Sequence, residues 1–398
     1  MSVDEHVDDF NEPDAVSEEQ GDDLAFTRAQ LVKGALGTAG GLALLSAFGG
    51  SAAAGVLKQF SRLQVPTPTV KPVIDGDLNW FTWAQFVPPE VVKGFENEYK
   101  VKVHQSFMAS DEEYVQKLAA GLPYDLITTN NGYMPQTLAG NLVQPFDPND
   151  LKNFKHLLPY FKQPYWDKGR YRYTMPYDYG PTGIMYRADR VNHITHSWND
   201  MWSNPEAKGH IYLLSAIGDT LGMALLRNGY YCNSAVPAQV NKAANDLLKL
   251  KPWVASFTTN DGPPIASGDA WLMEGWGTPI YQGLLQAKDP HNIRFFVPKE
   301  GPLMACDTLS IGRKAKHPGT ALLFIDWLLR PDNNAALAKY IILKTGTTAG
   351  NAAFAQQVKK YPDFNFSDAL IKNRKNWKIA PVGSQLQLWN QAWSRVTA

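Results

Sequence analysis

From residue 76 onward, segments with the alternation of β-strands and segments with the periodicity of α-helices follow one another along the chain. Apolar side chains recur every three or four residues after Pro88 and Pro89, and again in residues 237–250 and 319–329. Ser110 with Glu113 forms a capping box that predicts the start of a further helix, which Gly121 ends. Short alternating or apolar runs predict strands within residues 79–86, 101–107, 124–129, 209–215, 292–298 and 306–312. Strands that alternate with helices predict an α/β fold with largely parallel sheets.

The turn signals between these segments indicate two domains that exchange chain more than once. A length of 398 residues is too great for one ordinary core. Turn-forming residues cluster at 177–183 and 345–350, and no single long linker divides the chain. Several short crossings between two lobes are expected to leave this pattern. The Pro-rich segment 63–76 is typical of an extended linker that leads into the folded body.

The first 54 residues have the layout of an export signal with an acidic extension. Residues 1–26 contain ten acidic residues and no Lys or Arg, and Arg28 and Lys33 then precede a stretch rich in Gly, Ala and Leu. A transmembrane anchor is the alternative, although the stretch is weakly hydrophobic. The sequence around Ala29 resembles a twin-arginine signal in which Ala29 replaces the second Arg. We expect export, while the route and the cleavage of the signal stay open.

Charge and cysteine content limit the function classes that remain. Without the signal, the chain has 36 basic and 28 acidic residues, and these are scattered with no basic run that would indicate nucleic-acid binding. Cys232 and Cys306 are too few for a structural zinc site. They can pair in an exported protein, but the apolar surroundings of Cys306 favour free thiols.

The sequence lacks the motifs of common catalytic sites. No P-loop, HExxH or GxSxG pattern is present, and His193 and His196 have no third metal ligand nearby. Asp219 begins an apolar run, where a helix N-cap and a ligand-binding role are equally compatible with the pattern. Asp307 lies alone among small and apolar residues, where an unpaired charge costs several kcal/mol.

Several stretches, all in one order, resemble the periplasmic binding proteins of bacterial ABC importers, and most closely the spermidine/putrescine-binding subgroup. They cover nearly the whole chain from about residue 76 onward and include "WAQFVPPEVVKGFENEYKVKV", "YDLITTNNGYM", "MPYDYGPTGIMYRADRV", "SWNDMW", "GMALLRNGY" and "CDTLSIGRKAKHPGTALLFIDWLLRPDNNAALAKY". The resemblance implies a two-lobed α/β fold with hinge-linked lobes. The expected organisation is a signal (1–54), a linker (55–75), lobe 1 (76–179 and 307–343) and lobe 2 (180–306 and 344–398).

The resemblance also implies a ligand site between the lobes. Trp83 and Trp276 match aromatic walls of the family, Asp307 matches its ligand carboxylate, and Asp219 falls where a second acid is expected. Asn130 stands where the family has Ser. The alternatives are core packing for each Trp and an internal N–H or Arg partner for Asp307.

Other positions depart from the family pattern. Gly132 replaces a Tyr of the family, and the neighbouring Tyr133 is a candidate substitute for that aromatic wall. Ala84, Ala216 and Ala305 replace a hydroxyl residue, an acid and a stacking Trp, respectively. The loss of one wall and one carboxylate points to a different or larger ligand.

These expectations combine into one predicted function and two alternatives. The protein is predicted to be the periplasmic or otherwise extracytoplasmic substrate-binding subunit of an ABC importer. It would capture a small organic cation, putrescine or spermidine first, and deliver it to a membrane permease. We expect no catalysis, no cofactor, no metal, no nucleic-acid partner and a monomeric protein. The alternatives are the same role with a sugar, an amino-acid derivative or an anion, and a secreted hydrolase that uses Asp219 and Asp307.

Overall fold

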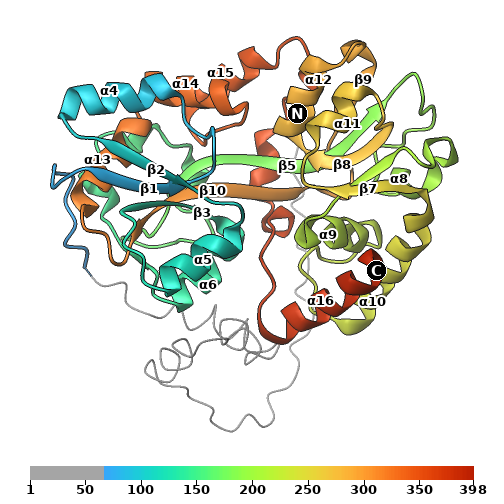
Figure 1. The fold of residues 1–398 in the computed structure, drawn as a ribbon, viewed down its shortest axis with the longest axis horizontal. Helices are drawn as coiled ribbons and strands as arrows, with labels where there is room; N and C mark the ends of the chain where they lie inside the picture. The colour runs from blue at the N-terminus through green and yellow to red at the C-terminus, as the bar shows by residue number, and fades with distance from the viewer. Residues whose placement is uncertain (1–66) are drawn as a thin grey trace, which may run out of the picture.

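The protein, described by a computed structural model over residues 67–398, has two halves that share one continuous β-sheet (Figure 1). The expected export signal and its Ala29-containing motif lie outside the described residues. Residues 67–75, the described part of the expected linker, contain no helix or strand. Asp75 nevertheless accepts hydrogen bonds from the backbone N–H groups of Gly319 and Thr320, at 2.9 Å each.

The strands follow the order β2-β1-β3-β10-β5-β8-β6-β7 across the sheet, with β4 paired to β10 and β9 paired to β5. They are β1 (Leu78–Thr82), β2 (Val103–Phe107), β3 (Leu126–Asn130), β4 (Val143–Gln144), β5 (Met175–Arg187), β6 (Ile211–Leu214), β7 (Val254–Thr258), β8 (Leu272–Trp276), β9 (Ile293–Phe296) and β10 (Leu303–Gly312).

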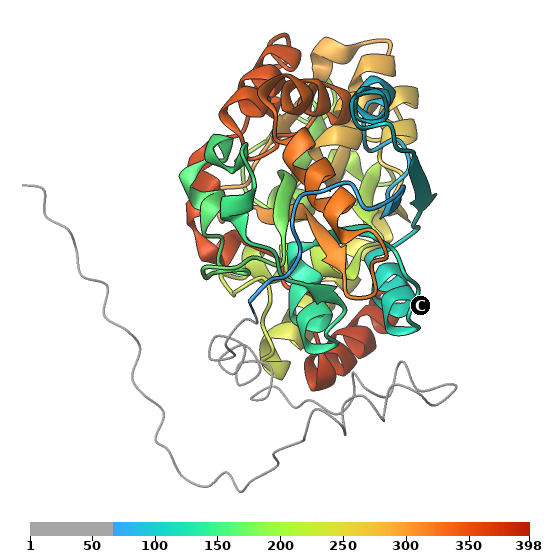
Figure 2. The same ribbon diagram turned by 90° about the vertical axis from the view of Figure 1, so that its left-hand side faces the viewer.

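Helices cover both faces of this sheet in each half, as Figures 1 and 2 show. They are α4 (Pro89–Tyr99), α5 (Asp111–Ala119), α6 (Met134–Ala139), α7 (Pro159–Lys162), α8 (Asp200–Ser203), α9 (Ile217–Arg227), α10 (Pro237–Leu250), α11 (Gly262–Ser267), α12 (Gly277–Gln286), α13 (Pro318–Leu328), α14 (Pro331–Ile341), α15 (Thr348–Gln357) and α16 (Gly383–Thr397). No helix within residues 67–398 combines the length and the apolar character that a membrane crossing requires.

The two flanks of the sheet are parallel, but its centre is antiparallel. β1 pairs in parallel with β2 and β3, and β6 does so with β7 and β8. β5 and β10 are antiparallel to each other and to their outer neighbours, and both run across from one half to the other (Figure 1). The expectation of largely parallel sheets therefore holds for the flanks and fails at the crossing.

The prediction of turns at residues 177–183 is wrong, because these residues lie within the 13-residue strand β5. Its glycines allow close packing and do not form a turn. A Cβ atom on Gly183 would lie 2.5 Å from the carbonyl oxygen of Phe296, and one on Gly180 would lie 2.9 Å from the side chain of Leu343. Only glycine lets the neighbouring segments approach the crossing strand this closely.

Local sequence signals place the first two helices as predicted. α4 begins with Pro89 in its first turn and buries Val91, Val92 and Phe95. α5 has Ser110 as its N-cap, whose hydroxyl accepts a hydrogen bond from the backbone N–H of Glu113 at 3.3 Å. This cap fixes where α5 starts, and the first residue of the helix, Asp111, becomes part of the site described below.

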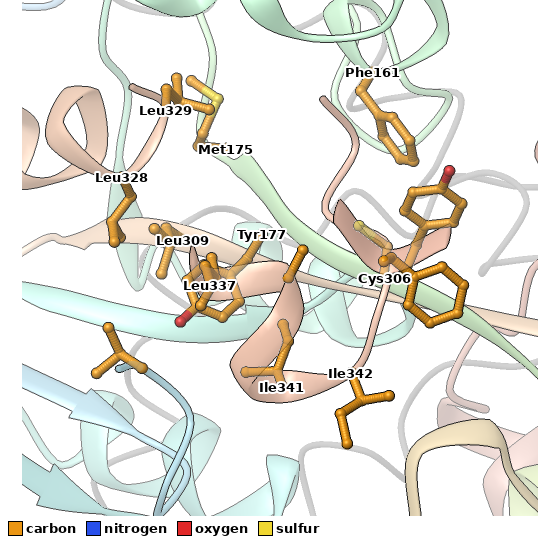
Figure 3. Packing of buried hydrophobic residues seen from close by; sticks show 14 of the residues in the cluster. Phe161, Met175, Tyr177, Cys306, Leu309, Leu328, Leu329, Leu337, Ile341 and Ile342 are labelled. Carbon is orange, nitrogen blue, oxygen red and sulfur yellow. The ribbon is translucent and has the colours of Figure 1, made fainter. Parts of the chain in front are cut away.

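A buried apolar cluster fixes the two crossing strands. Figure 3 shows Leu337 and Ile341 of α14 against the region of the sheet that carries Tyr177 of β5 and Leu309 of β10, and all four are at most 4% exposed. Cys306 of β10 lies in the same cluster and is fully buried. Both cysteines of the described chain, Cys306 and Cys232, are free, which confirms the expectation of unpaired thiols.

Candidate functional site

Asp307 lies on β10 where this strand crosses between the two halves, and the residue is half-buried. The side-chain amide of Asn130 donates to it at 2.8 Å. Burial raises the pKa of Asp307 to about 6, and hydrogen bonds from Asn130 and from the indole of Trp83 oppose this rise. Of the alternative of an internal N–H or Arg partner, the N–H part is confirmed by Asn130, whereas no Arg partners this carboxylate within residues 67–398.

Two more acids accompany Asp307, and together the three form what we call the acidic cluster: Asp111, Asp178 and Asp307. Asp178 faces Asp307 in the pairing of β5 with β10, next to an irregularity in the register between Asp307 and Thr308. Asp111 is the first residue of α5. The pKa values of Asp178 and Asp111 are raised well above the ordinary value, first by burial and second by the charge of Asp307.

The acidic cluster is incompletely satisfied by the protein. The Oδ2 atom of Asp178 and the Oδ1 atom of Asp111 are buried and have no hydrogen-bond partner, and Asp178 is only 4% exposed. Buried carboxyl oxygens without a partner are uncommon in folded proteins and call for an explanation. A cationic group between these acids would supply the missing donors.

Trp83 and Asn130 lie at the ends of neighbouring strands and reach the acidic cluster together. Trp83 directly follows β1, and Asn130 is the last residue of β3. The Oδ1 atom of Asn130 also accepts the backbone N–H of Gly132 at 2.9 Å, which orients its amide toward Asp307. Trp83 is half-buried and packs against the small apolar cluster that contains Phe81 and Ile127.

Tyr133 contacts a different group from the other predicted residues. Its hydroxyl donates to Glu112 of α5, and burial followed by the charge of Glu112 raises its pKa. Its hydroxyl is therefore committed to a side chain outside the acidic cluster. The charge of Asp111 also raises this pKa, so the ring lies near the acidic cluster, and the role of Tyr133 as a substitute aromatic wall stays a prediction.

Asp219 marks a second end of the site, which belongs to the other half of the sheet. It lies in the first turn of α9 but is not the N-cap, because that position is Ala216. The ammonium of Lys378 contacts its two carboxylate oxygens at 2.6 and 2.7 Å. The hydroxyl of Thr182 and the indole N–H of Trp276 also donate to it, the latter at 3.4 Å.

Lys378 was not predicted from the sequence, and it connects the two ends. It precedes α16 in the segment that descends past the crossing strands in Figure 1. Its backbone N–H donates to Met304 of β10 at 3.0 Å, and its carbonyl accepts the side chain of Asn131 at 3.2 Å. Its charge also lowers the pKa values of Asp307 and Asp111, so its ammonium acts on both ends.

Sequence reasoning thus found one acid at each end and missed three other charged groups: Asp111, Asp178 and Lys378. Asp111 directly follows the helix cap Ser110 and was not singled out, and Asp178 lay in the supposed turn cluster. No periodicity or motif distinguishes Lys378 from the other lysines near the C-terminus. Within residues 67–398, no group of three or more His, Cys, Asp or Glu side chains is placed to hold a metal ion.

Comparison with known proteins gives consistent matches over most of the chain. The family model described as "Bacterial extracellular solute-binding protein" matches residues 90–365. The spermidine/putrescine-binding periplasmic protein of Escherichia coli is 30% identical over 333 residues, which cover 81% of this chain and 92% of that protein. The putrescine-binding periplasmic protein PotF of the same organism is 28% identical, covering 72% of this chain and 82% of that protein.

Solved structures of the same general kind share the fold. The spermidine/putrescine ABC transporter substrate-binding protein PotD of Streptococcus pneumoniae superposes with a TM-score of 0.70 at 22% identity, over 81% of this chain and 98% of that one. The TpPotD lipoprotein of Treponema pallidum gives a TM-score of 0.71 at 22% identity, over 80% and 98%. At this level of identity the superpositions establish the two-lobed architecture that the sequence predicted.

Proposed function

This chain belongs to the bacterial extracellular solute-binding proteins, in the family that contains the spermidine/putrescine-binding periplasmic proteins, and from that membership we propose that it captures a small organic cation of the polyamine class. It acts outside the cytoplasm as the substrate-binding component of an ABC importer and delivers the cation to a membrane permease. It is a binding protein and not an enzyme.

The acidic cluster is the single observation that carries the ligand class. Two of its buried carboxyl oxygens have no donor within the described protein, and Asp307 is half-buried beside the indole of Trp83. An alkylammonium group offers several N–H donors and a positive charge, while its methylene chain suits a flat aromatic face. A sugar or an anion would leave the carboxylate of Asp307 without a counter-charge.

The expected energies are of the right order for a transport protein. A charge-assisted hydrogen bond to a buried carboxylate contributes about 1.5–3 kcal/mol. A cation–π contact with an indole adds about 0.5–2 kcal/mol. Several such contacts, together with burial of the methylene chain, reach the roughly 8 kcal/mol that a micromolar dissociation constant requires.

We also propose that the ligand lies between two lobes that close upon it, with the boundaries expected from the sequence: residues 76–179 with 307–343, and residues 180–306 with 344–398. In support, β5 and β10 run from one half to the other (Figure 1). The segment after α14 lies beside them, because Tyr179 of β5 forms an isolated bridge with Lys344. Trp83, Asn130 and Asp307 would bind the ligand from lobe 1 and the crossing, and Trp276 would face them from lobe 2.

The alternative of a secreted hydrolase has no support. It required Asp219 and Asp307 to act as a pair, but Asp219 is bound by Lys378. Membership in a family of binding proteins argues against it independently.

We also propose that the twin-arginine-like signal around Ala29 directs the export of the protein and that the exported protein is a monomer.

The test is calorimetric titration of the purified protein with putrescine and with spermidine. We expect binding by the natural protein and a loss of affinity of about tenfold or more in Asp307→Asn, which keeps the shape but removes the charge. Asp332→Asn, an exposed acid in the first turn of α14, is the matched control and should bind normally. Absence of heat with every amine, or equal binding by Asp307→Asn, would refute the proposal.

A further inference from the structure

The ion pair between Lys378 and Asp219 occupies the second end of the proposed ligand site. Both carboxylate oxygens of Asp219 contact the ammonium, at 2.6 and 2.7 Å. The carboxylate also accepts from Thr182 and from the indole N–H of Trp276. Its acceptor capacity is therefore largely used by the protein, in contrast to the acidic cluster around Asp307.

This pair is well shielded from water. The side chain of Asp219 is 5% exposed and that of Lys378 is 19% exposed. Removal of one partner of a buried ion pair strongly destabilises the folded protein, because the other charge is left buried without a counter-charge. A ligand ammonium would have to displace Lys378 to reach Asp219, which makes the exchange unfavourable unless Lys378 finds another partner.

The two ends of the site differ in the net charge of their side chains. At the Asp219 end, one negative and one positive side chain cancel. The nearby Glu274 is mainly protonated at neutral pH and adds little negative charge, since burial raises its pKa to about 8. At the Asp307 end, three carboxyl groups lie together, and no ammonium or guanidinium forms an ion pair with any of them within the described residues. Burial also raises the pKa values of Asp111 and Asp178, so Asp307 is the main anionic group at this end, and it has no cationic partner within residues 67–398.

We propose that Lys378 supplies from the protein itself the ammonium that a diamine would bring to Asp219, so that the site selects ligands with one ammonium group and an uncharged tail. This inference rests on the proposed function and specifies its ligand class. The ammonium of the ligand binds the acidic cluster, and its tail lies toward Trp276 and the neutral ion pair. An acylated diamine, such as N-acetylputrescine, fits this description better than putrescine.

The test is a ratio of two dissociation constants, measured by calorimetry in the natural protein and in Lys378→Gln. N-acetylputrescine and putrescine share a four-carbon chain and differ in the charge at one end. Lys378→Gln frees Asp219 for the second ammonium of putrescine. We expect putrescine to gain about tenfold or more in affinity relative to N-acetylputrescine.

Two further variants keep the test decisive. Lys375→Gln removes an exposed lysine from the same segment and should leave the ratio unchanged. The double variant Asp219→Asn with Lys378→Gln makes this end neutral again without any buried charge. Its ratio should return to that of the natural protein. If Lys378→Gln alone fails to fold, the comparison of N-acetylputrescine with 4-aminobutyrate in the natural protein still tests the inference.

The outcomes separate this inference from the proposed function. If amines bind but the ratio is the same in the natural protein, in Lys378→Gln and in the double variant, the inference is wrong while the proposed function stands. Tighter binding of 4-aminobutyrate than of N-acetylputrescine by the natural protein would also overturn it, because Lys378 would then act as a cation toward the ligand. If neither amine binds any variant, the proposed function fails and the inference fails with it.

Discussion

Asp219 and Asp307 lie at the two ends of one site, and only Asp219 has its charge neutralised by an ion pair within the described protein. Asp219 is enclosed by an ammonium, a hydroxyl and an indole, whereas Asp307 has only neutral donors and two further acids around it. Both were candidate ligand residues in the sequence, where their contexts looked alike. The difference arises from Lys378, which is 159 residues away from Asp219 along the chain.

The state of Asp307 makes cation binding dependent on pH. The pKa of Asp307 is raised to about 6, and a bound cation favours the ionised carboxylate, so binding releases a proton below this pH. Its charged and titratable neighbours are Asp111, Asp178 and Lys378, and the first two have raised pKa values. Affinity should be nearly constant above about pH 7 and should fall by up to about tenfold per unit below about pH 6.

Calorimetry across this pH range, in buffers of different ionisation enthalpy, measures both the affinity and the released protons. In Asp307→Asn, the affinity that remains should no longer fall as the pH is lowered through about 6. A flat affinity profile in the natural protein between about pH 5 and pH 7 would contradict the assignment of Asp307 as the main anionic group.

At the scale of elements, the strands and helices with strong local signals were predictable, and the crossing strand was not. Proline at N1 and the periodic Val91, Val92 and Phe95 identified α4, and Ser110 identified the start of α5. β5 contains Gly180, Pro181 and Gly183, which usually indicate turns. Their role is to permit contact with Phe296 and Leu343, and such long-range contacts leave no local pattern in the sequence.

β8 carries a buried acid that links this element to the stability of the protein. Glu274 is fully buried; its Oε2 atom accepts from Leu214 and Thr220, while its Oε1 atom has no partner. Burial raises the pKa of Glu274 to about 8 and that of Asp261 to about 7. Between their unfolded and folded pKa values the folded protein binds more protons, so the free energy of unfolding should fall as pH rises from about 4 to about 8.

Glu274→Gln keeps both accepted hydrogen bonds if its amide oxygen takes the place of Oε2. We expect this variant to be more stable than the natural protein at about pH 9 and to show a shallower decline over the preceding range. Urea unfolding at several pH values measures this, with Glu90→Gln on the exposed face of α4 as the control. Parallel stability profiles for the natural protein and Glu274→Gln would contradict the raised pKa.

At the scale of the whole molecule, the two-lobed architecture could be predicted from the order of short family-like stretches, although no one stretch was decisive. Asp307, Trp83 and Asn130 come together as expected. Lys378 could not be predicted, because its position depends on a C-terminal segment whose backbone contacts both halves. Ala380 donates to the carbonyl of Gly132, and Ile379 donates to the side chain of Asn233.

Ligand binding should bring the two halves closer together. The ligand would contact Asp307 and Trp83 on one side and Trp276 on the other, so its contacts favour the closed arrangement. We expect small-angle X-ray scattering to show a smaller radius of gyration with saturating N-acetylputrescine or putrescine. Asp307→Asn should not contract at the same ligand concentration. Unchanged scattering from the natural protein at demonstrated saturation would exclude such closure.

The irregular pairing beside Asp307 affects how related chains can be compared. Asp307 pairs with Asp178 and Thr308 pairs with Pro176, so Tyr177 is one extra residue in β5. Side chains alternate between the faces of a sheet, and a shift of one residue reverses them all. A relative that lacks this insertion would therefore direct the counterpart of Asp178 to the opposite face, and an alignment without a gap here would equate residues that never meet the same ligand.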